Sequence, residues 1–168
     1  MTEKKKWKYQ GRLKLSVQDR YETPIEAWAD ILKYFKKDDL IYDPFYFNGA
    51  TLTHLKKLGY NNVYHKKEDA FIHKIMKEAI VITNPPWSIK AKVFDYYDVT
   101  NNKVALLLPM DTMERKYMKK YLKNFQLIIP NFRYDFDKSK KGHPAWKACW
   151  FCWNLQKELE TNEKLIWL

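Results

Sequence analysis

Three short apolar runs constrain the fold of this chain more than any other feature of its sequence. They are LIYD at 40–43, AIVIT at 79–83 and KVALLLP at 103–109. Each run is continuously apolar rather than alternating, which is typical of strands that are buried on both faces of a parallel sheet. Amphipathic segments separate the runs, as the crossovers between parallel strands require. The sequence therefore predicts an α/β fold with a mostly parallel sheet and helices on both faces.

The remaining elements are predicted from apolar spacing and from residues that begin or end helices. Thr23, Pro24 and Glu26 supply an N-cap, a first-turn proline and a capping-box acid for a helix that runs to Phe35. The other predicted elements are a helix at 51–59 ended by Gly59, a strand at 61–65, a short helix or loop at 70–78, a helix at 89–97, a basic helix at 111–124 capped by Asp111, and strands at 125–129 and 147–155.

Length and charge limit the class of protein. A chain of 168 residues fits one domain, which we expect at 15–168. Residues 1–14 are basic and lack the apolar core of a secretion signal, so we predict a flexible arm on an intracellular protein that is not secreted. No stretch approaches the ~20 apolar residues that span a bilayer, so no membrane partner is expected. The formal net charge of +11 and the aromatic share of 17% favour a nucleic acid as partner.

Cysteines and histidines do not indicate a metal site. Cys149 and Cys152 have C-x-x-C spacing, but there is no second pair to complete a zinc site. In a strand, positions three apart face opposite sides, so we expect two buried thiols in the core. Trp146, Trp150 and Trp153 are also expected in the core. The four histidines lack metal-ligand spacing, and no metal is predicted.

The segment N-P-P-W at 84–87 is the sharpest functional signal, and it follows a predicted buried strand. Pro85 and Pro86 remove two backbone donors and fix two φ angles, which makes the loop stiff. A stiff loop suits a site in which the Asn84 side-chain oxygen and the Pro85 carbonyl both accept hydrogen bonds from one amino group. Trp87 offers a face on which a planar base can stack. The structural alternative is a rigid strand exit with a packed tryptophan.

A second segment, DPFYFNGAT at 43–51, follows another predicted strand. Asp43 and Asn84 therefore both come after the carboxyl ends of parallel strands, where open α/β sheets bind ligands. Asp43 is expected either to contact a bound amino group, directly or through water, or to cap a helix. Asn48 and Gly49 supply a left-handed turn in this loop.

Together these two segments resemble the motifs of class I S-adenosylmethionine-dependent methyltransferases of the amino-methylating branch, especially the adenine-N(6) enzymes. YETP at 21–24, NVYHKKEDAF at 62–71, FRYDF at 132–136 and ACWFCW at 148–153 resemble further parts of the same enzymes. The resemblance covers about residues 21–155. It implies a Rossmann-like methyltransferase fold, S-adenosyl-L-methionine as cofactor, and methyl transfer to an exocyclic amino group, above all N(6) of adenine in DNA or RNA. A target base in a duplex would have to be flipped out.

The resemblance also implies roles for single residues. The catalytic positions would be Asn84, Pro85, Pro86 and Trp87, with Trp87 also binding the target. The cofactor-binding positions would be Tyr21, Thr23, Asp43, Phe45, Asn48, Gly49, Glu68, Asp69 and Phe71. Two positions depart from the pattern. Phe47 stands where the loop usually has its first glycine, and His65 stands where an acid usually bonds the ribose hydroxyls, with Glu68 as the substitute.

Basic residues near the expected target entrance are predicted to contact phosphates, namely Arg115, Lys138, Lys140 and Lys141. Asp111 and Thr112 follow a strand and either contact the target or cap the next helix. So short a chain has little room for a target-recognition domain, and specificity would then come from loops, from a protein partner or from RNA shape. Two alternatives stay open. One is a catalytically silent nucleic-acid-binding subunit, favoured by Phe47 and His65, and the other is a methyltransferase for a protein amide or small amine.

Overall fold

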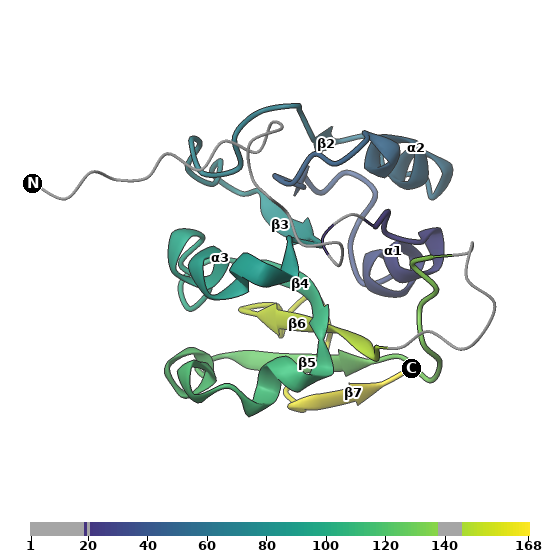
Figure 1. Ribbon diagram of the computed structural model, residues 1–168. Coiled ribbons are helices and arrows are strands. Elements are labelled where there is room, and N and C mark those ends of the chain that lie inside the picture. Colours follow the sequence, from purple (N-terminus) through teal and green to yellow (C-terminus); the bar gives the residue numbers. More distant parts are fainter. Residues whose placement is uncertain (1–18, 20, 138–145) are drawn as a thin grey trace, which may run out of the picture.

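A single sheet runs through the computed structural model, which describes residues 19, 21–137 and 146–168 (Figure 1). In this part of the chain the sheet has seven strands in the order β2-β1-β3-β4-β6-β5-β7. Pairing is parallel at β1/β2, β1/β3, β3/β4 and β5/β7, whereas β6 is antiparallel to β4 and β5. The predicted α/β fold with a mostly parallel sheet is confirmed. The strands are β1 (Ile41–Tyr42), β2 (Val63–Tyr64), β3 (Ile80–Thr83), β4 (Val104–Pro109), β5 (Phe125–Ile129), β6 (Ala148–Trp153) and β7 (Leu165–Trp167).

Helices cover both faces of the sheet, as predicted. On one face, α1 (Ile25–Leu32) and α2 (Ala50–Lys57) pack through residues such as Trp28 and Leu55. On the other face, α3 (Lys90–Tyr96) packs through Phe94. The β1–α2–β2 and β3–α3–β4 connections run in opposite directions across the sheet. Because such crossovers are right-handed, their helices belong on opposite faces.

The prediction of one basic helix at 111–124 is wrong. Two 3₁₀ helices, η3 (Met110–Glu114) and η4 (Lys116–Tyr121), replace it, separated by an extended Arg115. Met118 and Tyr121 are both buried, and a three-residue period brings them onto one side. Asp111 makes no capping hydrogen bond and instead lies 3.2 Å from Arg115. Thr112 is fully buried.

Thr23 is not the N-cap of α1. The cap position is Pro24, with no side-chain capping bond, and the Pro24 carbonyl accepts from the amides of Ala27 and Trp28. The extended ψ of 148° at Pro24 places Thr23 one residue too early to reach the first helical amides. The Thr23 hydroxyl is instead bonded to Asn84.

The remaining predictions have mixed outcomes. Residues 70–78 form a loop, and β7 has no counterpart among the predicted strands. Cys149 and Cys152 are buried and free, and they lie in the core clusters on opposite faces of the sheet, as predicted. Trp150 and Trp153 are buried, but Trp146 is 39% exposed because it precedes β6.

Some predictions fall on residues that the structure does not describe. The arm at 1–14 and the lysines Lys138, Lys140 and Lys141 lie outside the described ranges. None of the helices that are described is long and apolar enough to cross a membrane.

Candidate functional site

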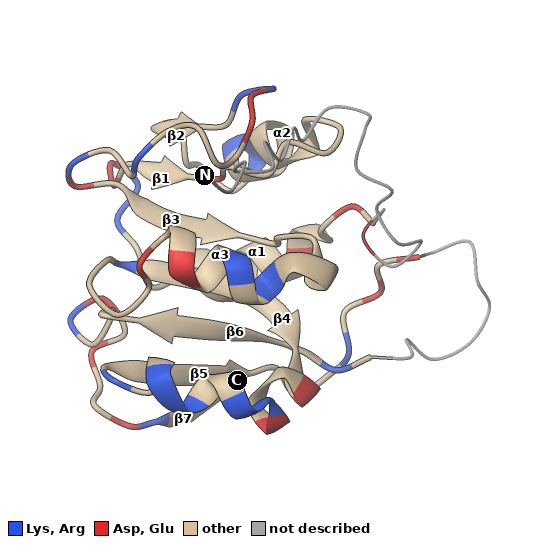
Figure 2. Cartoon of the chain, turned by 60° about the vertical axis from the view of Figure 1, so that its left-hand side comes forward, with Lys and Arg blue, Asp and Glu red and all other residues tan. Residues whose placement is uncertain are grey.

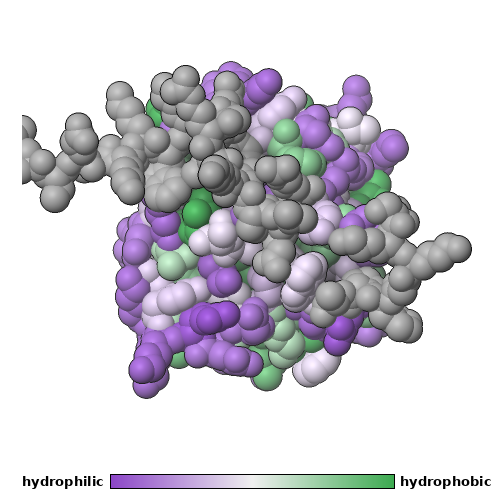
Figure 3. All heavy atoms as spheres, in the orientation of Figure 1, coloured by the Kyte–Doolittle hydropathy of each residue, from purple (hydrophilic) through white to green (hydrophobic). Residues whose placement is uncertain are grey.

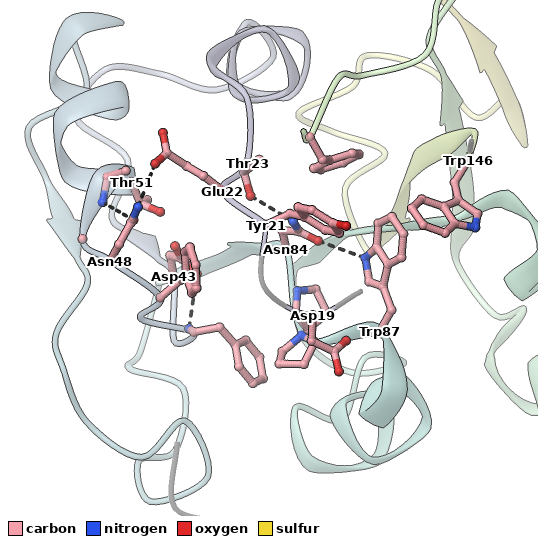
Figure 4. A pocket seen from close by; sticks show the side chains of 17 residues that line it. Asp19, Tyr21, Glu22, Thr23, Asp43, Asn48, Thr51, Asn84, Trp87 and Trp146 are labelled. Carbon is pink, nitrogen blue, oxygen red and sulfur yellow. Dashed lines mark hydrogen bonds between the residues drawn. The ribbon is translucent and has the colours of Figure 1, made fainter. Parts of the chain in front are cut away.

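The candidate site lies where the strand order reverses. From β1 the chain passes to β2 on one side and then to β3 on the other, so β1 and β3 flank a topological switch point. In open α/β sheets, ligands bind beyond the carboxyl ends of the strands at such a point. A pocket that is partly open to solvent lies there. Figure 4 shows Asp43 and Asn84, which follow β1 and β3, among the side chains around it.

The pocket brings together most of the residues predicted for the site. Those that line it are Tyr21, Thr23, Asp43, Phe45, Asn48, Gly49, Asn84, Pro85, Pro86 and Trp87. Three segments that are distant in the sequence supply them: the residues before α1, the loop between β1 and α2, and the loop after β3. The two loops therefore form one site rather than two separate turns.

The Asn84 amide is held at both ends. Its Nδ2 donates to the Thr23 hydroxyl at 3.0 Å, and its Oδ1 accepts from Trp87 Nε1 at 3.0 Å (Figure 4). An indole N–H can only donate, so the amide atom that faces Trp87 must be the oxygen. The orientation of Asn84 thus follows from its neighbours. Pro85 and Pro86, which come next, are buried.

Trp87 is fixed by a second hydrogen bond and by two aromatic neighbours. Its Nε1 also donates to the Leu107 carbonyl of β4 at 3.1 Å. Its ring meets Phe136 and Trp146 edge to face, with centroids 5.6 and 6.1 Å away. All three aromatic residues line the pocket, and this end of the site therefore suits a planar group.

Asp43 is a buried carboxylate in the half of the pocket that follows β1. Its carboxylate accepts from the Thr83 hydroxyl at 2.5 Å and from the Phe45 amide at 3.3 Å, and it lies 3.1 Å from Nδ1 of His65. Burial lowers the pKa of His65, but the hydrogen bonds and charge of Asp43 outweigh burial and raise it above its ordinary value. The helix-cap alternative for Asp43 is not observed, since α2 begins at Ala50.

His65 is directed toward the protein interior. Its side chain is 1% exposed, and its ring stacks on Tyr46 with centroids 4.8 Å apart. It is absent from the described pocket lining. The residue that departs from the expected acid therefore pairs with Asp43 across β1 and β2 rather than presenting a polar group to a ligand.

The loop before α2 is built on Asn48 and Gly49. Asn48 Oδ1 accepts from the Ala50 amide at 3.0 Å, and its Nδ2 donates to Glu22 at 2.7 Å. Gly49 has φ of +82°, where a side chain would be strained, so the predicted left-handed turn is confirmed. Phe47 is 45% exposed and lines the pocket rather than filling the core.

The charge of the pocket is opposite to that of the chain. Asp19, Glu22 and Asp43 line it, and its described lining contains no Lys, Arg or His. The chain as a whole has a formal charge of +11. Carboxylates in a partly enclosed site favour a cationic group and disfavour phosphate.

Four predicted residues lie elsewhere. Glu68, Asp69, Phe71 and Arg115 are not part of the described lining. Glu68 lies 3.0 Å from His73, and Asp69 accepts from the Phe71 amide at 3.0 Å. Phe71 packs edge to face on the pocket residue Phe45, one layer behind it.

Sequence reasoning assigned no role to six lining residues, namely Asp19, Glu22, Ala50, Thr51, Phe136 and Trp146. Ala50 and Thr51 end the segment DPFYFNGAT, which the resemblance had indicated. Glu22 and Phe136 lie within YETP and FRYDF, so the resemblance had indicated their segments without assigning them a role. Asp19 belongs to no motif, and only its contact with Ser88 reveals it.

Comparisons with known proteins were made by sequence family, by curated relatives and by fold. Neither a family model, nor a curated protein, nor a solved structure matches the chain.

Proposed function

We propose that the chain is an S-adenosylmethionine-dependent methyltransferase with a Rossmann-like methyltransferase fold that acts on an exocyclic amino group, with N(6) of adenine in DNA or RNA as the preferred target. One observation carries the proposal. The loop after β1 and the N-P-P-W loop after β3, which resemble the cofactor and target motifs, line the same pocket at the switch point of the sheet.

The chemistry of the lining supports this cofactor. S-adenosylmethionine carries an electrophilic methyl group on a cationic sulfonium, together with an ammonium and a carboxylate group, so it is cationic overall. Glu22 provides negative charge near the β1 half, where the carboxylate of Asp43 is paired with His65, and Asn48 and Gly49 shape the loop there.

The β3 half supports an amino group as the target. The Asn84 oxygen gives one lone pair to Trp87 and retains the other, so it can accept from an amino group. The Pro85 carbonyl is the second acceptor. Two fixed acceptors draw the amino hydrogens toward the loop and leave the nitrogen lone pair directed away from it. Trp87 orients the attached ring. Transfer would form the N–CH₃ bond as the S–CH₃ bond of the cofactor breaks, with S-adenosylhomocysteine as the leaving group, and the cationic nitrogen would then release its proton to solvent.

A nucleic acid is the proposed partner because of charge outside the pocket. The formal charge of the chain is +11. Exposed lysines such as Lys116 and Lys119 of η4 carry part of it, and Figure 2 shows Lys and Arg in blue on several elements. Hydrophilic residues make up much of the face shown in Figure 3 outside the grey atoms. Exposed lysines contact phosphates without reading sequence. The acidic pocket would then receive only the uncharged base and the cofactor.

Calorimetric binding of S-adenosylmethionine is the first test, with Glu22→Gln as the variant and Glu26→Gln as its control. Both residues are exposed, but Glu22 lines the pocket, whereas Glu26 lies on α1 outside the described lining. Asp43 is a poorer choice, because it also anchors Thr83 and His65. We expect micromolar binding, weakened by Glu22→Gln and unchanged by Glu26→Gln.

Transfer of a radiolabelled methyl group to DNA and RNA then tests the reaction. Asn84→Ala should keep cofactor binding and lose transfer. Absence of binding at millimolar cofactor, with and without nucleic acid, would contradict the proposal and favour the silent subunit. Transfer to proteins or small amines but not to nucleic acid would favour the other alternative.

A further inference from the structure

Asp19 holds the residue that follows the N-P-P-W motif. Its Oδ1 accepts from the Ser88 amide at 3.2 Å, and its Oδ2 accepts from the Ser88 hydroxyl at 2.7 Å. Asp19 is only 9% exposed and also lines the pocket (Figure 4). A nearly buried carboxylate that receives two hydrogen bonds from one residue is a defined attachment point, because charge-assisted bonds are stronger than neutral ones.

The motif needs such an attachment because of its prolines. Pro85 and Pro86 have no N–H, so two consecutive residues cannot be held through backbone donors. The next donors are the amides of Trp87 and Ser88, and the latter donates to Asp19. On the other side, the Lys90 ammonium donates to the Trp87 carbonyl at 3.4 Å, a longer contact. The exit of the motif also forms a local turn, the 3₁₀ helix η2 (Trp87–Ile89), in which the Ile89 amide donates to the Pro86 carbonyl at 3.1 Å. Asp19 adds to this local turn an attachment to a distant part of the chain.

The segment before α1 holds both ends of the motif. Thr23 accepts from Asn84, its first residue, and Asp19 accepts from Ser88, just beyond its last residue. The same segment reaches the loop before α2 through Glu22, which accepts from Asn48. It therefore spans the pocket from one half to the other.

From this geometry we propose that Asp19 is a positioning residue, which acts through Ser88 to set Trp87 and Asn84 for the target group. This inference rests on the proposed function but assigns a residue that neither motif contains. Asp19 does not take part in the transfer itself. It holds the C-terminal end of the motif in place. The position of that end sets the position of the Trp87 ring and of Asn84, whose side-chain oxygen accepts from Trp87 Nε1.

Two readouts on one set of variants test the proposal. The first is hydrogen exchange of the Trp87 indole N–H by NMR, with the signal identified by Trp87→Phe. The second is steady-state methyl transfer. The variants are Asp19→Ala, Asp19→Asn and Ser88→Ala, with Asp38→Ala as control. Asp38 is exposed before β1, at the opposite edge of the sheet.

For Asp19→Ala we expect indole exchange at Trp87 to become at least about tenfold faster, with the other indole signals unchanged. We expect kcat to fall about 10- to 100-fold, because small misplacements of catalytic groups cost that much, while KM for the cofactor changes less than about twofold. Asp19→Asn keeps an oxygen for the Ser88 amide and should recover most of kcat. Adding Ser88→Ala to Asp19→Ala should cost little more, since the two residues act as one unit.

Three results would overturn the proposal. The first is that hydrogen exchange at the Trp87 indole is unchanged in Asp19→Ala. The second is that the loss of kcat follows a fall in Tm and is not recovered by Asp19→Asn. The third is that Asp38→Ala has the same effects as Asp19→Ala. If wild type transfers no methyl group, the proposed function fails by itself. Selectively faster exchange at Trp87 would then still support the attachment of the motif to Asp19, and unchanged exchange would reject that as well.

Discussion

Asp43 and His65 form a buried pair, with the carboxylate 3.1 Å from Nδ1 of the imidazole and both side chains at most 3% exposed. The Asp43 carbonyl also lies 3.0 Å from the same nitrogen. Because both neighbours are acceptors, Nδ1 carries the proton in either charge state of the ring. Among the described residues, Nε2 of His65 has no hydrogen-bond partner. The pair joins the end of β1 to the end of β2 beneath the pocket.

The stability of the fold should depend on this pair. Burial lowers the pKa of His65 and the bonds to Asp43 raise it, with a net rise above 6.5. The folded protein therefore binds the proton more tightly than the unfolded chain. The resulting stabilisation is fully present below pH 6.5 and is lost as pH rises through the folded pKa. Urea unfolding at several pH values should show this decline. His65→Gln should remove this pH-dependent decline, whereas His73→Gln, at an exposed position, should keep it. If the decline persists in His65→Gln, another titratable group causes it.

Thr23→Val tests whether the Thr23 hydroxyl holds the Asn84 side chain in position for methyl transfer. The change keeps the shape of the side chain but removes the hydroxyl that accepts from Asn84 Nδ2. A hydrogen bond of about 0.5–1.5 kcal/mol corresponds to a roughly two- to tenfold loss, which we expect in kcat for methyl transfer. Tm should change little, because Thr23 makes no capping bond to α1. Thr53→Val, exposed on α2, is the matched control, and equal kcat values in the two variants would contradict this role of Thr23.

Gly49→Ala and Gly59→Ala form a matched pair. Both glycines have φ near +80°, at +82° and +85°, so both variants bear a left-handed strain of about 1–2 kcal/mol. A Cβ at Gly49 would also lie 2.6 Å from the Tyr46 hydroxyl, whereas at Gly59 the nearest atom is 3.7 Å away. Unfolding should therefore show a larger loss of stability for Gly49→Ala. Cofactor binding should weaken in that variant alone, and equal effects on both measurements would refute the argument.

The two cysteines should be unreactive in the folded protein. Burial raises the pKa of Cys149 to about 11 and raises that of Cys152 further. Only the thiolate reacts with disulfide reagents, so neither residue should be labelled at pH 8 before unfolding. Both should be labelled after denaturation. Rapid labelling of either thiol in the native protein would show that β6 opens readily.

The sequence by itself determined the class of fold and the segments of the site. Continuous apolar runs are local signals, and they indicated β1, β3 and β4 within one or two residues. The stiffness of Pro85 and Pro86 and the left-handed turn at Gly49 are also local properties. Because parallel strands run in the same direction, their carboxyl ends could also be predicted to lie at one edge of the sheet.

Only the tertiary structure decided which partners these residues have. Thr23 and Asn84 are 61 positions apart, and Asp19 and Ser88 are 69 apart, so no local pattern links them. A threonine before a proline and a helix satisfies the pattern of an N-cap, yet its hydroxyl is bonded to another segment. Likewise, the pairing of His65 with Asp43 depends on β1 and β2 being neighbours. Hydrogen bonds between distant segments form only once the sheet has brought them together, and they give the pocket its polar geometry.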